Sequence, residues 1–279
     1  MPADTKNRLL VQPEDPNATI WKYMDLPELI YLLQERKLWF SRLDMLGDPF
    51  EGSVQQSLLD TVTFPTPPGL ADTARPHIEA FSKAAMRRAF YEQRLCNYVS
   101  CWSMQDKELM ALWRSYRRSD FSVAIRSTYA ILRDQLPNIP FGKVFYTNFS
   151  HPVDLEMIGK NIFHLSIRKH EALRFENEIR AIYPYLHIQE LHPTINVLQP
   201  VAVPVEQFDF EKAFPLPDVT KLPKGEPTSV EVNTLVMEIR SNPTCPDWFI
   251  PQLKKLCEGL GYKGQVSRSI LDPRDWTLI

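Results

Sequence analysis

The chain has 279 residues, of which 44% are hydrophobic and 24% are charged, and its formal net charge at pH 7 is −2. That length suffices for one large domain or two small ones. The near-neutral charge excludes a general electrostatic field that would attract nucleic acid or an anionic membrane, although a local basic patch is compatible with it. No stretch approaches the roughly 20 apolar residues of a membrane span, and residues 1–16 lack the apolar segment of a signal peptide. We therefore expect a cytoplasmic protein without a membrane partner.

Hydrophobic periodicity predicts an alternation of short strands and medium-length helices after a flexible polar leader at 1–18. The expected strands lie at 20–23, 38–41, 97–103, 121–126, 143–146, 175–184, 234–240 and 264–270. The expected helices lie at 27–36, 76–91, 107–116, 155–173 and 247–260, and Ser127 is placed to cap a further one. This alternation predicts a single α+β domain over 19–279, with a short, mixed or mostly antiparallel central sheet flanked by helices.

The chain holds 24 prolines but only 9 glycines. Proline is excluded from helix interiors and central strands, so the prolines should collect in connections. Seven of them fall within 187–228, which predicts an irregular excursion or edge strands that proline interrupts. The scarcity of glycine disfavours a glycine-rich phosphate loop. The four cysteines have the spacing of neither a zinc cluster nor a disulfide framework, and are expected to be reduced.

The central candidate for function is the charged run from Phe175 to Arg180, inside the expected strand 175–184. Residues two apart share a face of a strand, so Glu176, Glu178 and Arg180 should lie together. Two carboxylates held close repel each other, which raises one pKa and lets that group keep a proton. Such a pair suits acid–base chemistry or the stabilisation of a developing cation. A half-exposed strand with solvated, locally paired charges explains the same pattern without a function.

Several segments along the chain carry a recognisable combination of residues. They are Trp21–Tyr23 before a helix, Leu38–Ser41, Asp48–Glu51, Tyr98–Ser103 followed by Met110–Trp113, Phe175–Arg180, and Val266–Ser269. In order and rough spacing they resemble a widespread bacterial family catalogued as domain of unknown function 2971. The resemblance spans about 20–271 and implies an architecture and candidate positions more than an activity.

Glu-x-Glu on a strand also resembles the arrangement of ADP-ribosyltransferases, and Ser100–Ser103 loosely resembles the serine-bearing second motif of that family. The resemblance implies NAD as the donor and a nucleotide or nucleic acid as the partner. It implies that Glu178 binds the nicotinamide ribose and stabilises an oxocarbenium-like transition state. The chain departs from the family where Lys22 and Tyr23 stand in place of an arginine or a histidine, and the Ser-Thr-Ser spacing is absent.

The run Asp48–Glu51 has two interpretations. In the structural one, Asp48 caps a turn, and Phe50 anchors that turn in the core. In the functional one, Asp48 and Glu51 point into the same cleft as the two glutamates of the charged run. Four converging carboxylates would suit Mg²⁺ or Mn²⁺ and the hydrolysis of a nucleotide or phosphodiester. We assign no metal ligand from the sequence.

The remaining candidates could bind substrate or cofactor around the charged run. Together with Asp48 and Glu51 they are Tyr23, Ser41, Ser100, Ser103, Trp113 and Lys169. Core packing explains Trp113 as well as ring stacking does, and a helix end explains Lys169. Beside the transferase and the metal-dependent hydrolase, a binding module without turnover stays open. The hypotheses share one geometric requirement, which is that these residues meet in one concave pocket.

Overall fold

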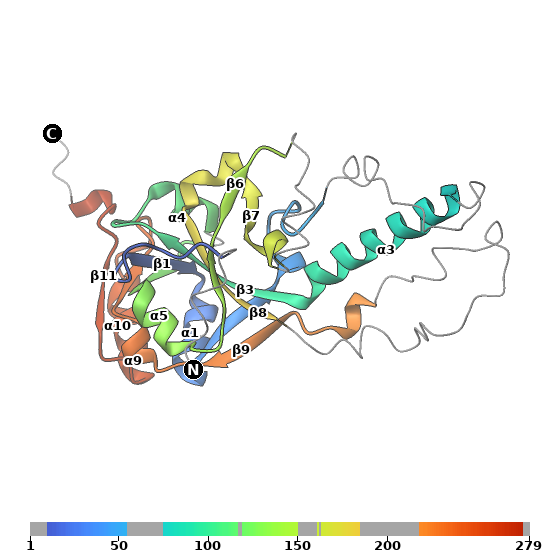
Figure 1. The fold of residues 1–279 in the computed structure, drawn as a ribbon. Helices are drawn as coiled ribbons and strands as arrows, with labels where there is room; N and C mark the ends of the chain where they lie inside the picture. The colour runs from blue at the N-terminus through green and yellow to red at the C-terminus, as the bar shows by residue number, and fades with distance from the viewer. Residues whose placement is uncertain are drawn as a thin grey trace.

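The central sheet gathers strands from most of the length of the chain (Figure 1). The computed structural model describes residues 10–54, 75–116, 119–149, 161, 163–184 and 218–275. One nine-stranded sheet runs in the order β11-β10-β4-β1-β3-β2-β9, and β8 pairs with both β3 and β5. Its strands are β1 (Thr19–Met24), β2 (Lys37–Arg42), β3 (Asn97–Met104), β4 (Val123–Thr128), β5 (Phe141–Lys143), β8 (Glu178–Pro184), β9 (Gly225–Ser229), β10 (Glu238–Ser241) and β11 (Gln265–Arg268).

Pairing within this sheet is antiparallel except between β10 and β11. A separate parallel ribbon joins β6 (Phe145–Thr147) to β7 (Arg168–His170). The α-helices are α1 (Leu26–Glu35), α3 (Arg75–Cys96), α4 (Met110–Tyr116), α5 (Tyr129–Gln135), α9 (Val232–Leu235) and α10 (Phe249–Gly259). The 3-10 turns are η1 (Leu43–Met45), η3 (His164–Ile167), η4 (Glu171–Glu176), η6 (Val219–Lys221) and η7 (Pro273–Asp275). The predicted α+β class with a mixed, mostly antiparallel sheet is confirmed.

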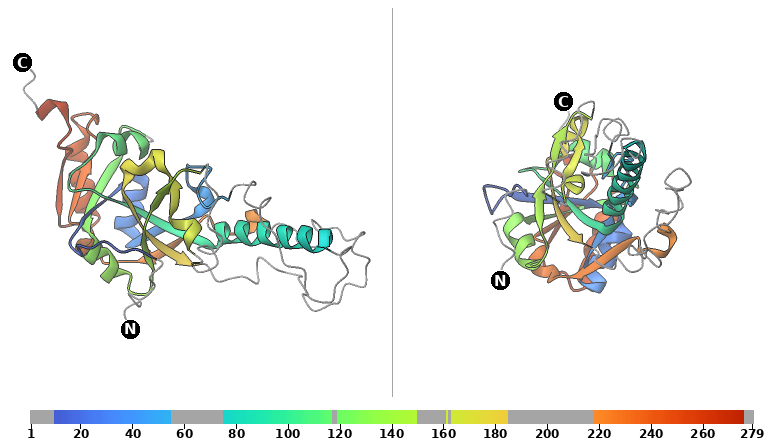
Figure 2. Two further views of the ribbon diagram at one scale, coloured as in Figure 1. Left: turned by 45° about the horizontal axis from the view of Figure 1, so that its top comes forward. Right: turned by 45° about the vertical axis from the view of Figure 1, so that its right-hand side comes forward.

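The two faces of the sheet are covered differently. On one face, α1, α5, α9 and α10 pack the main core, which includes Ile125 of β4 and Ile179 of β8. On the other face, α4 covers Trp21 and Tyr23 of β1. A second small cluster, built on Leu10, Val99 and Ile182, also packs on this face. Side chains alternate along a strand. The side chains of β8 that point away from the main core therefore lie on the same face as α4 and the Leu10 cluster. Helix α3 projects away from the sheet (Figure 2).

Strand β3 has a gap along one edge. Its Tyr98 and Val99 pair with β2, whereas its Ser103 and Met104 pair with β1. The other edge of β3 pairs with β8 from Asn97 to Ser103 without a gap. The residues between the two pairings, 100–102, therefore border the place where β1 and β2 separate. The split leaves residues 100–102 without a partner in β1 or β2, while their pairing with β8 continues.

The described parts of the leader and of the proline-rich segment lie against the sheet. Leu10 is buried, and the Val11 carbonyl accepts a hydrogen bond from the Lys143 N–H at 2.8 Å. The end of the proline-rich segment forms the edge strand β9, which contains Pro227 and pairs only with β2. Residues 1–9 and 185–217 lie outside the described part of the chain. Within the described residues, no helix has both the length and the apolar character that a membrane crossing requires.

The local prediction around the charged run was wrong in one important respect. Residues 175–184 do not form one strand, because Glu176 ends the 3-10 turn η4 and β8 begins at Glu178. Asn177 between them has a φ of 41° and a ψ of 59°, a left-handed conformation that asparagine tolerates better than most residues. The Asn177 N–H donates to the Arg174 carbonyl at 3.2 Å, and the Asn177 carbonyl accepts a hydrogen bond from the Met104 N–H at 2.8 Å.

Other boundaries also differ from the predictions. Of the helix expected at 155–173, the described residues form η3, β7 and the start of η4, so Lys169 lies on a strand rather than at a helix end. The single strand expected at 143–146 is two strands, β5 and β6. The strand expected at 234–240 begins as helix α9. Thr128, not Ser127, caps α5, because its hydroxyl accepts a hydrogen bond from the Ile131 N–H.

Candidate functional site

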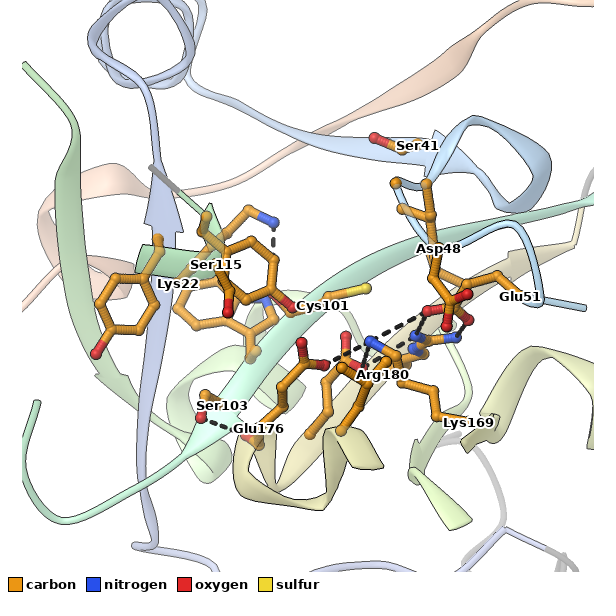
Figure 3. A pocket seen from close by; sticks show the side chains of 18 of the residues that line it. Lys22, Ser41, Asp48, Glu51, Cys101, Ser103, Ser115, Lys169, Glu176 and Arg180 are labelled. Carbon is orange, nitrogen blue, oxygen red and sulfur yellow. Dashed lines mark hydrogen bonds and ion pairs between the residues drawn. The ribbon is translucent and has the colours of Figure 1, made fainter. Parts of the chain in front are cut away.

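A buried cluster of five charged side chains lies under the split in the sheet (Figure 3). Three carboxylates, those of Glu51, Glu176 and Glu178, face two cations, Lys169 and Arg180. Each of the five residues is at most 5% exposed. The formal charge of the cluster is −1, since three carboxylates meet two cations. Burying an unpaired charge costs much free energy. The five side chains are therefore stable in the interior because they pair with one another.

Arg180 anchors the cluster on strand β8. Its Nη1 and Nη2 donate to both carboxylate oxygens of Glu51 at 2.8 and 2.7 Å. Nη2 also donates to Glu178 Oε2 at 3.0 Å, and Nη1 to the Ser166 carbonyl at 2.7 Å. A planar guanidinium suits this bidentate geometry better than an ammonium. Arg180 therefore fixes both the loop that carries Glu51 and the orientation of Glu178.

Lys169 reaches all three carboxylates from strand β7. Its Nζ lies 3.1 Å from Glu51 Oε1 and 3.2 Å from Glu178 Oε2. It also donates to Glu176 Oε2. This shared ammonium brings the two glutamates together although they stand on different elements. The expectation that Glu176, Glu178 and Arg180 lie side by side is met through Lys169, not through one strand face.

The two glutamates have opposite pKa shifts. Burial raises the pKa of Glu178, but the charges of Arg180 and Lys169 outweigh it and lower that pKa to about 2. Burial and the negative charge of Glu178 raise the pKa of Glu176, against the opposing effect of Lys169. Glu178 is therefore a fixed anion at neutral pH, and Glu176 is the carboxylate better suited to take up a proton. Paired groups with divergent pKa values are typical of acid–base sites.

The two oxygens of the Glu178 carboxylate have different surroundings. Glu178 Oε1 is buried and has no hydrogen bond among the described N–H and O–H donors, while Oε2 holds Arg180 and Lys169. The Cys101 thiol, a weak donor, interacts with this carboxylate. Burial and the charge of Glu178 raise the pKa of Cys101, so the sulfur stays a thiol. The Glu178 carboxylate is thus held through Oε2 by two cations, while Oε1 is enclosed by the protein.

The charge cluster forms the floor of a cavity of about 720 Å³. This volume is within the range of small-molecule and cofactor sites. The walls come from β1, the start of α1, β2 with the loop after it, β3, α4 and η4. Among the lining residues, Lys22 and Ser115 lie on one side and Asp48 lies on the other (Figure 3). Tyr116 and Phe50 also line the cavity. Burial and the charge of Glu178 raise the pKa of Tyr116, whose hydroxyl therefore remains a hydrogen-bond donor.

Lys22 supplies a cation at the split. Its Nζ lies 3.4 Å from the Cys101 carbonyl and 6.0 Å from the centre of the Trp102 ring. No carboxylate lies within 4.0 Å of it among the residues that the structure describes. Unlike Lys169 and Arg180, Lys22 has no ion-pair partner in the described part of the chain. An anionic group of a ligand entering the cavity would find its partner there.

The structure brings together most of the predicted site residues. The cavity is lined by Tyr23, Ser41, Asp48, Glu51, Ser103, Lys169, Glu176, Glu178 and Arg180. Within it, Ser103 donates its hydroxyl to the Glu176 carbonyl, and Tyr23 packs edge-on against Trp113 at 5.0 Å. Asp48 caps its turn through the Phe50 N–H at 2.9 Å. Phe50 itself is exposed and is not the core anchor that the sequence suggested.

Two predicted site residues lie outside the cavity. Ser100 is fully buried on the opposite face of β3, where its hydroxyl accepts a hydrogen bond from Trp102 Nε1 at 3.2 Å. Trp113 is buried behind Tyr23 and donates its ring N–H to Glu108 at 2.8 Å. Both residues are structural in this arrangement. The alternation of β3 could have excluded Ser100, because Cys101 and Ser103 share the other face.

Sequence reasoning missed several residues of the cavity and of its supports. Cys101, Tyr116 and Lys22 line it but were not assigned to it. Tyr146 supports it from behind, since its hydroxyl accepts a hydrogen bond from the Glu178 N–H at 2.9 Å. Strand alternation would have placed Cys101 beside Ser103. The positions of Tyr116 and Tyr146 depend on how α4 and β6 pack, and no local pattern indicates them.

The interpretation as a metal site is weakened by the cluster itself. Lys169 and Arg180 occupy the centre towards which Glu51, Glu176 and Glu178 point. The carboxylate of Asp48 accepts a hydrogen bond from the Phe50 N–H within its own turn. Within the described ranges, no group of three or more His, Cys, Asp and Glu side chains is arranged to hold a metal ion.

The glycine spacing at the end of the chain does not form a nucleotide loop. Gly259, Gly261 and Gly264 match G-x-G-x-x-G, but they follow helix α10 and precede strand β11. Dinucleotide binding by this motif requires the reverse order, with a strand leading into a helix whose N-terminus meets the phosphates. The cavity beside β8 is therefore the better candidate for a nucleotide.

Comparison with known proteins leaves the family open. No protein-family model matches the chain, and no curated protein matches it, so the resemblance to the family of unknown function stays a prediction. Among solved structures, the chain is similar to Thermus sp. 2.9 DarT in complex with ADP-ribosylated ssDNA, with 10% identity over 94% of this chain and 98% of that chain and a TM-score of 0.37. It is similar to the same protein in complex with NAD+, with 11% identity over 96% and 100% of the chains and a TM-score of 0.34. At these values the function has to be argued from the site.

Proposed function

We propose that this chain is an ADP-ribosyltransferase-like enzyme that transfers ADP-ribose from NAD to a nucleotide or nucleic acid. The observation that carries the proposal is the state of Glu178. It is buried, is held as an anion by Arg180 and Lys169, and lines the cavity. A fixed anion that lines a cavity is suited to stabilising a positive charge that develops on a ribose ring.

The reaction assigns a role to each group. The bond between ribose C1′ and the nicotinamide nitrogen breaks, and nicotinamide leaves with the electron pair. Glu178 stabilises the positive charge on the ribose, and Arg180 holds Glu178 in place. The acceptor forms the new bond to C1′, and its proton passes to Glu176, whose raised pKa favours uptake. Lys22, which contacts the Cys101 carbonyl, is the cation for the pyrophosphate of the donor.

The net charge of the cluster supports this assignment over hydrolysis of a phosphodiester. A formal charge of −1 at the floor attracts a cationic nicotinamide ribosyl group and repels a phosphate. The same three glutamates would have to release Lys169 and Arg180 before they could hold a metal ion. The transferase interpretation uses the cluster as it stands.

The test is turnover of NAD by the purified chain with and without oligonucleotide. Release of nicotinamide is measured by chromatography, and transfer is followed with labelled NAD. Glu178→Gln should lower both by about 100-fold or more while the circular dichroism spectrum is retained. Glu238→Gln is the matched control, since Glu238 is equally buried and ion-paired with Arg240 at 2.8 Å but lies outside the cavity.

Two outcomes would reject the proposal. The first is the absence of both NAD binding by calorimetry and nicotinamide release in folded wild-type protein. The second is equal loss of activity in Glu178→Gln and Glu238→Gln, which would indicate a general loss of structure. Activity that EDTA abolishes and Mg²⁺ restores would favour the metal-dependent hydrolase instead.

A further inference from the structure

The β6–β7 ribbon has one face turned to the charge cluster and another turned away from it. Tyr146 and Lys169 are register partners on the inner face, where they contact Glu178. Side chains alternate along a strand, so their neighbours lie on the outer face. There, Phe145 stands beside Arg168, and Thr147 stands beside His170.

Arg168 on this outer face has an unusual environment. It is 5% exposed, and its guanidinium lies 4.3 Å from the centre of the Phe149 ring. Among the described residues, no carboxylate lies within the 4.0 Å of an ion pair and no hydrogen-bond acceptor is placed against it. Burial lowers the pKa of Arg168, with no opposing charge to offset the effect. A buried guanidinium normally has a carboxylate or carbonyl partner, and Arg168 has none among the residues that the structure describes.

Aromatic rings connect Arg168 to the mouth of the cavity. Phe149 meets Phe50 edge-on at 5.9 Å between ring centres and His170 at 5.4 Å. Phe50 and His170 both line the cavity. Phe50 is 56% exposed and Phe145 is 57% exposed. An unpaired arginine flanked by exposed flat rings combines the two elements that a single nucleic-acid strand requires, which are stacking surfaces and a phosphate contact.

We propose that the outer face of the β6–β7 ribbon, formed by Phe145, Phe149, Arg168 and His170 together with Phe50, binds single-stranded nucleic acid. Bases stack on the exposed phenylalanine rings, and a backbone phosphate pairs with Arg168. The continuity of Phe50 and His170 with the cavity then presents the strand to Glu176 and Glu178. For the reaction that the bound strand enters, the inference rests on the proposed transferase function.

A single strand fits this surface better than a duplex or an acidic peptide. Stacking needs the flat faces of bases, which a duplex hides and a peptide lacks. The chain as a whole carries a net charge of −2, so attraction must come from the local arginine rather than from a general field. We expect weak salt dependence, with about one phosphate contact contributing to the slope.

The experiment is fluorescence anisotropy with labelled 20-residue oligodeoxynucleotide and oligoribonucleotide probes at low salt. Phe145→Ala should weaken binding about tenfold, the effect of losing one stacked base. Trp248→Ala is the matched control, because Trp248 is an aromatic residue of similar exposure, 58%, that packs on Phe121 away from the ribbon. Arg168→Gln should weaken binding and reduce the salt slope, whereas Arg168→Lys should keep the slope.

Three results would overturn the inference. They are the failure of folded wild-type protein to bind either probe, equal weakening by Phe145→Ala and Trp248→Ala, and equal affinity for a duplex or a phosphorylated peptide. If Arg168→Gln does not fold, Phe145→Ala and Phe50→Ala still decide the matter. Anisotropy needs neither NAD nor turnover, so it measures strand binding separately from the transferase reaction. Binding without NAD turnover would reject the transferase alone, and turnover without binding would reject this surface alone.

Discussion

Arg180 and Glu51 form a two-point ion pair between residues that are 129 positions apart in the chain. The two N–O distances are 2.8 and 2.7 Å, and both side chains are almost fully removed from solvent. The pair joins strand β8 to the loop after β2. It therefore sets one wall of the cavity at the same time as it orients Glu178.

Glu51→Gln should destabilise the fold strongly. The substitution leaves Arg180 with one carboxylate in a buried site, and breaking a buried pair from one side costs about 3–5 kcal/mol. Urea denaturation at pH 7 would measure the loss. Asp247→Asn is the control, because Asp247 is largely exposed and its pairs with Arg268 and Arg274 should contribute about 1 kcal/mol or less. Similar losses for the two variants would contradict the buried character of the cluster.

Stability should fall in acid partly through Glu178. The pKa of this group is about 2 in the folded chain against an ordinary value of 4.5. A lowered pKa stabilises the fold above pH 4.5, and the contribution is lost as the pH falls towards 2. Urea midpoints at pH 7, 5 and 3 should therefore converge for the wild type and Glu178→Gln as the pH falls. A constant difference between them at all three values would contradict the lowered pKa.

Glu176 should show the opposite sign. Burial and the charge of Glu178 raise its pKa, so its ionisation opposes folding as the pH rises through the raised value. Glu176→Gln should lose less stability than Glu178→Gln at pH 7, and it should flatten the rise of activity with pH. The pH profile of nicotinamide release, compared between wild type and variant, would measure this. An unchanged profile in Glu176→Gln would remove the proton-accepting role.

Cys101 should alkylate slowly although it lines the cavity. Burial and the nearby anion of Glu178 raise its pKa, and the thiolate is the reactive form. Glu178→Gln removes that anion and should speed labelling by iodoacetamide at pH 8, as followed by peptide mass spectrometry. Cys96 is an internal control, because burial and Glu92 raise its pKa to about 11 independently of the site. Parallel acceleration at both cysteines would indicate loosening of the fold instead.

Lys22→Met should weaken NAD binding with little effect on the chemical step. The side chain contacts only a carbonyl and a ring among described residues, so its removal leaves no carboxylate unpaired. A lost contact to a charged phosphate costs about 1.5–3 kcal/mol, which appears as a higher KM with kcat nearly unchanged. Lys22→Arg should restore most of the affinity. A fall in kcat at constant KM would place Lys22 at the reacting atoms rather than at the phosphates.

Local sequence patterns determined much of this protein. The spacing of apolar residues predicted β1, β2 and β3 and helices α1 and α10 to within a few residues. Each of these elements buries one face, so its apolar residues recur with the period of a strand or a helix. The same alternation placed Glu178 and Arg180 together and opposite Ile179, as the structure confirms. The interruption of the strand at Asn177 was not predicted.

Tertiary structure alone decided the site. Glu51 and Lys169 reach Glu178 only because the loop after β2 and strand β7 fold onto β8, contacts that no spacing in the chain encodes. The divergence of the two glutamate pKa values follows from that packing, since each depends on which cations approach in a buried place. By residue type, Ser100 and Trp113 were as plausible as the other candidates. Each of them packs on a side that does not line the cavity. Residue type and spacing determined which side chains of a strand point to the same face. Ion pairs between residues far apart in the chain accompany the packing that brings Glu51 and Lys169 to Glu178.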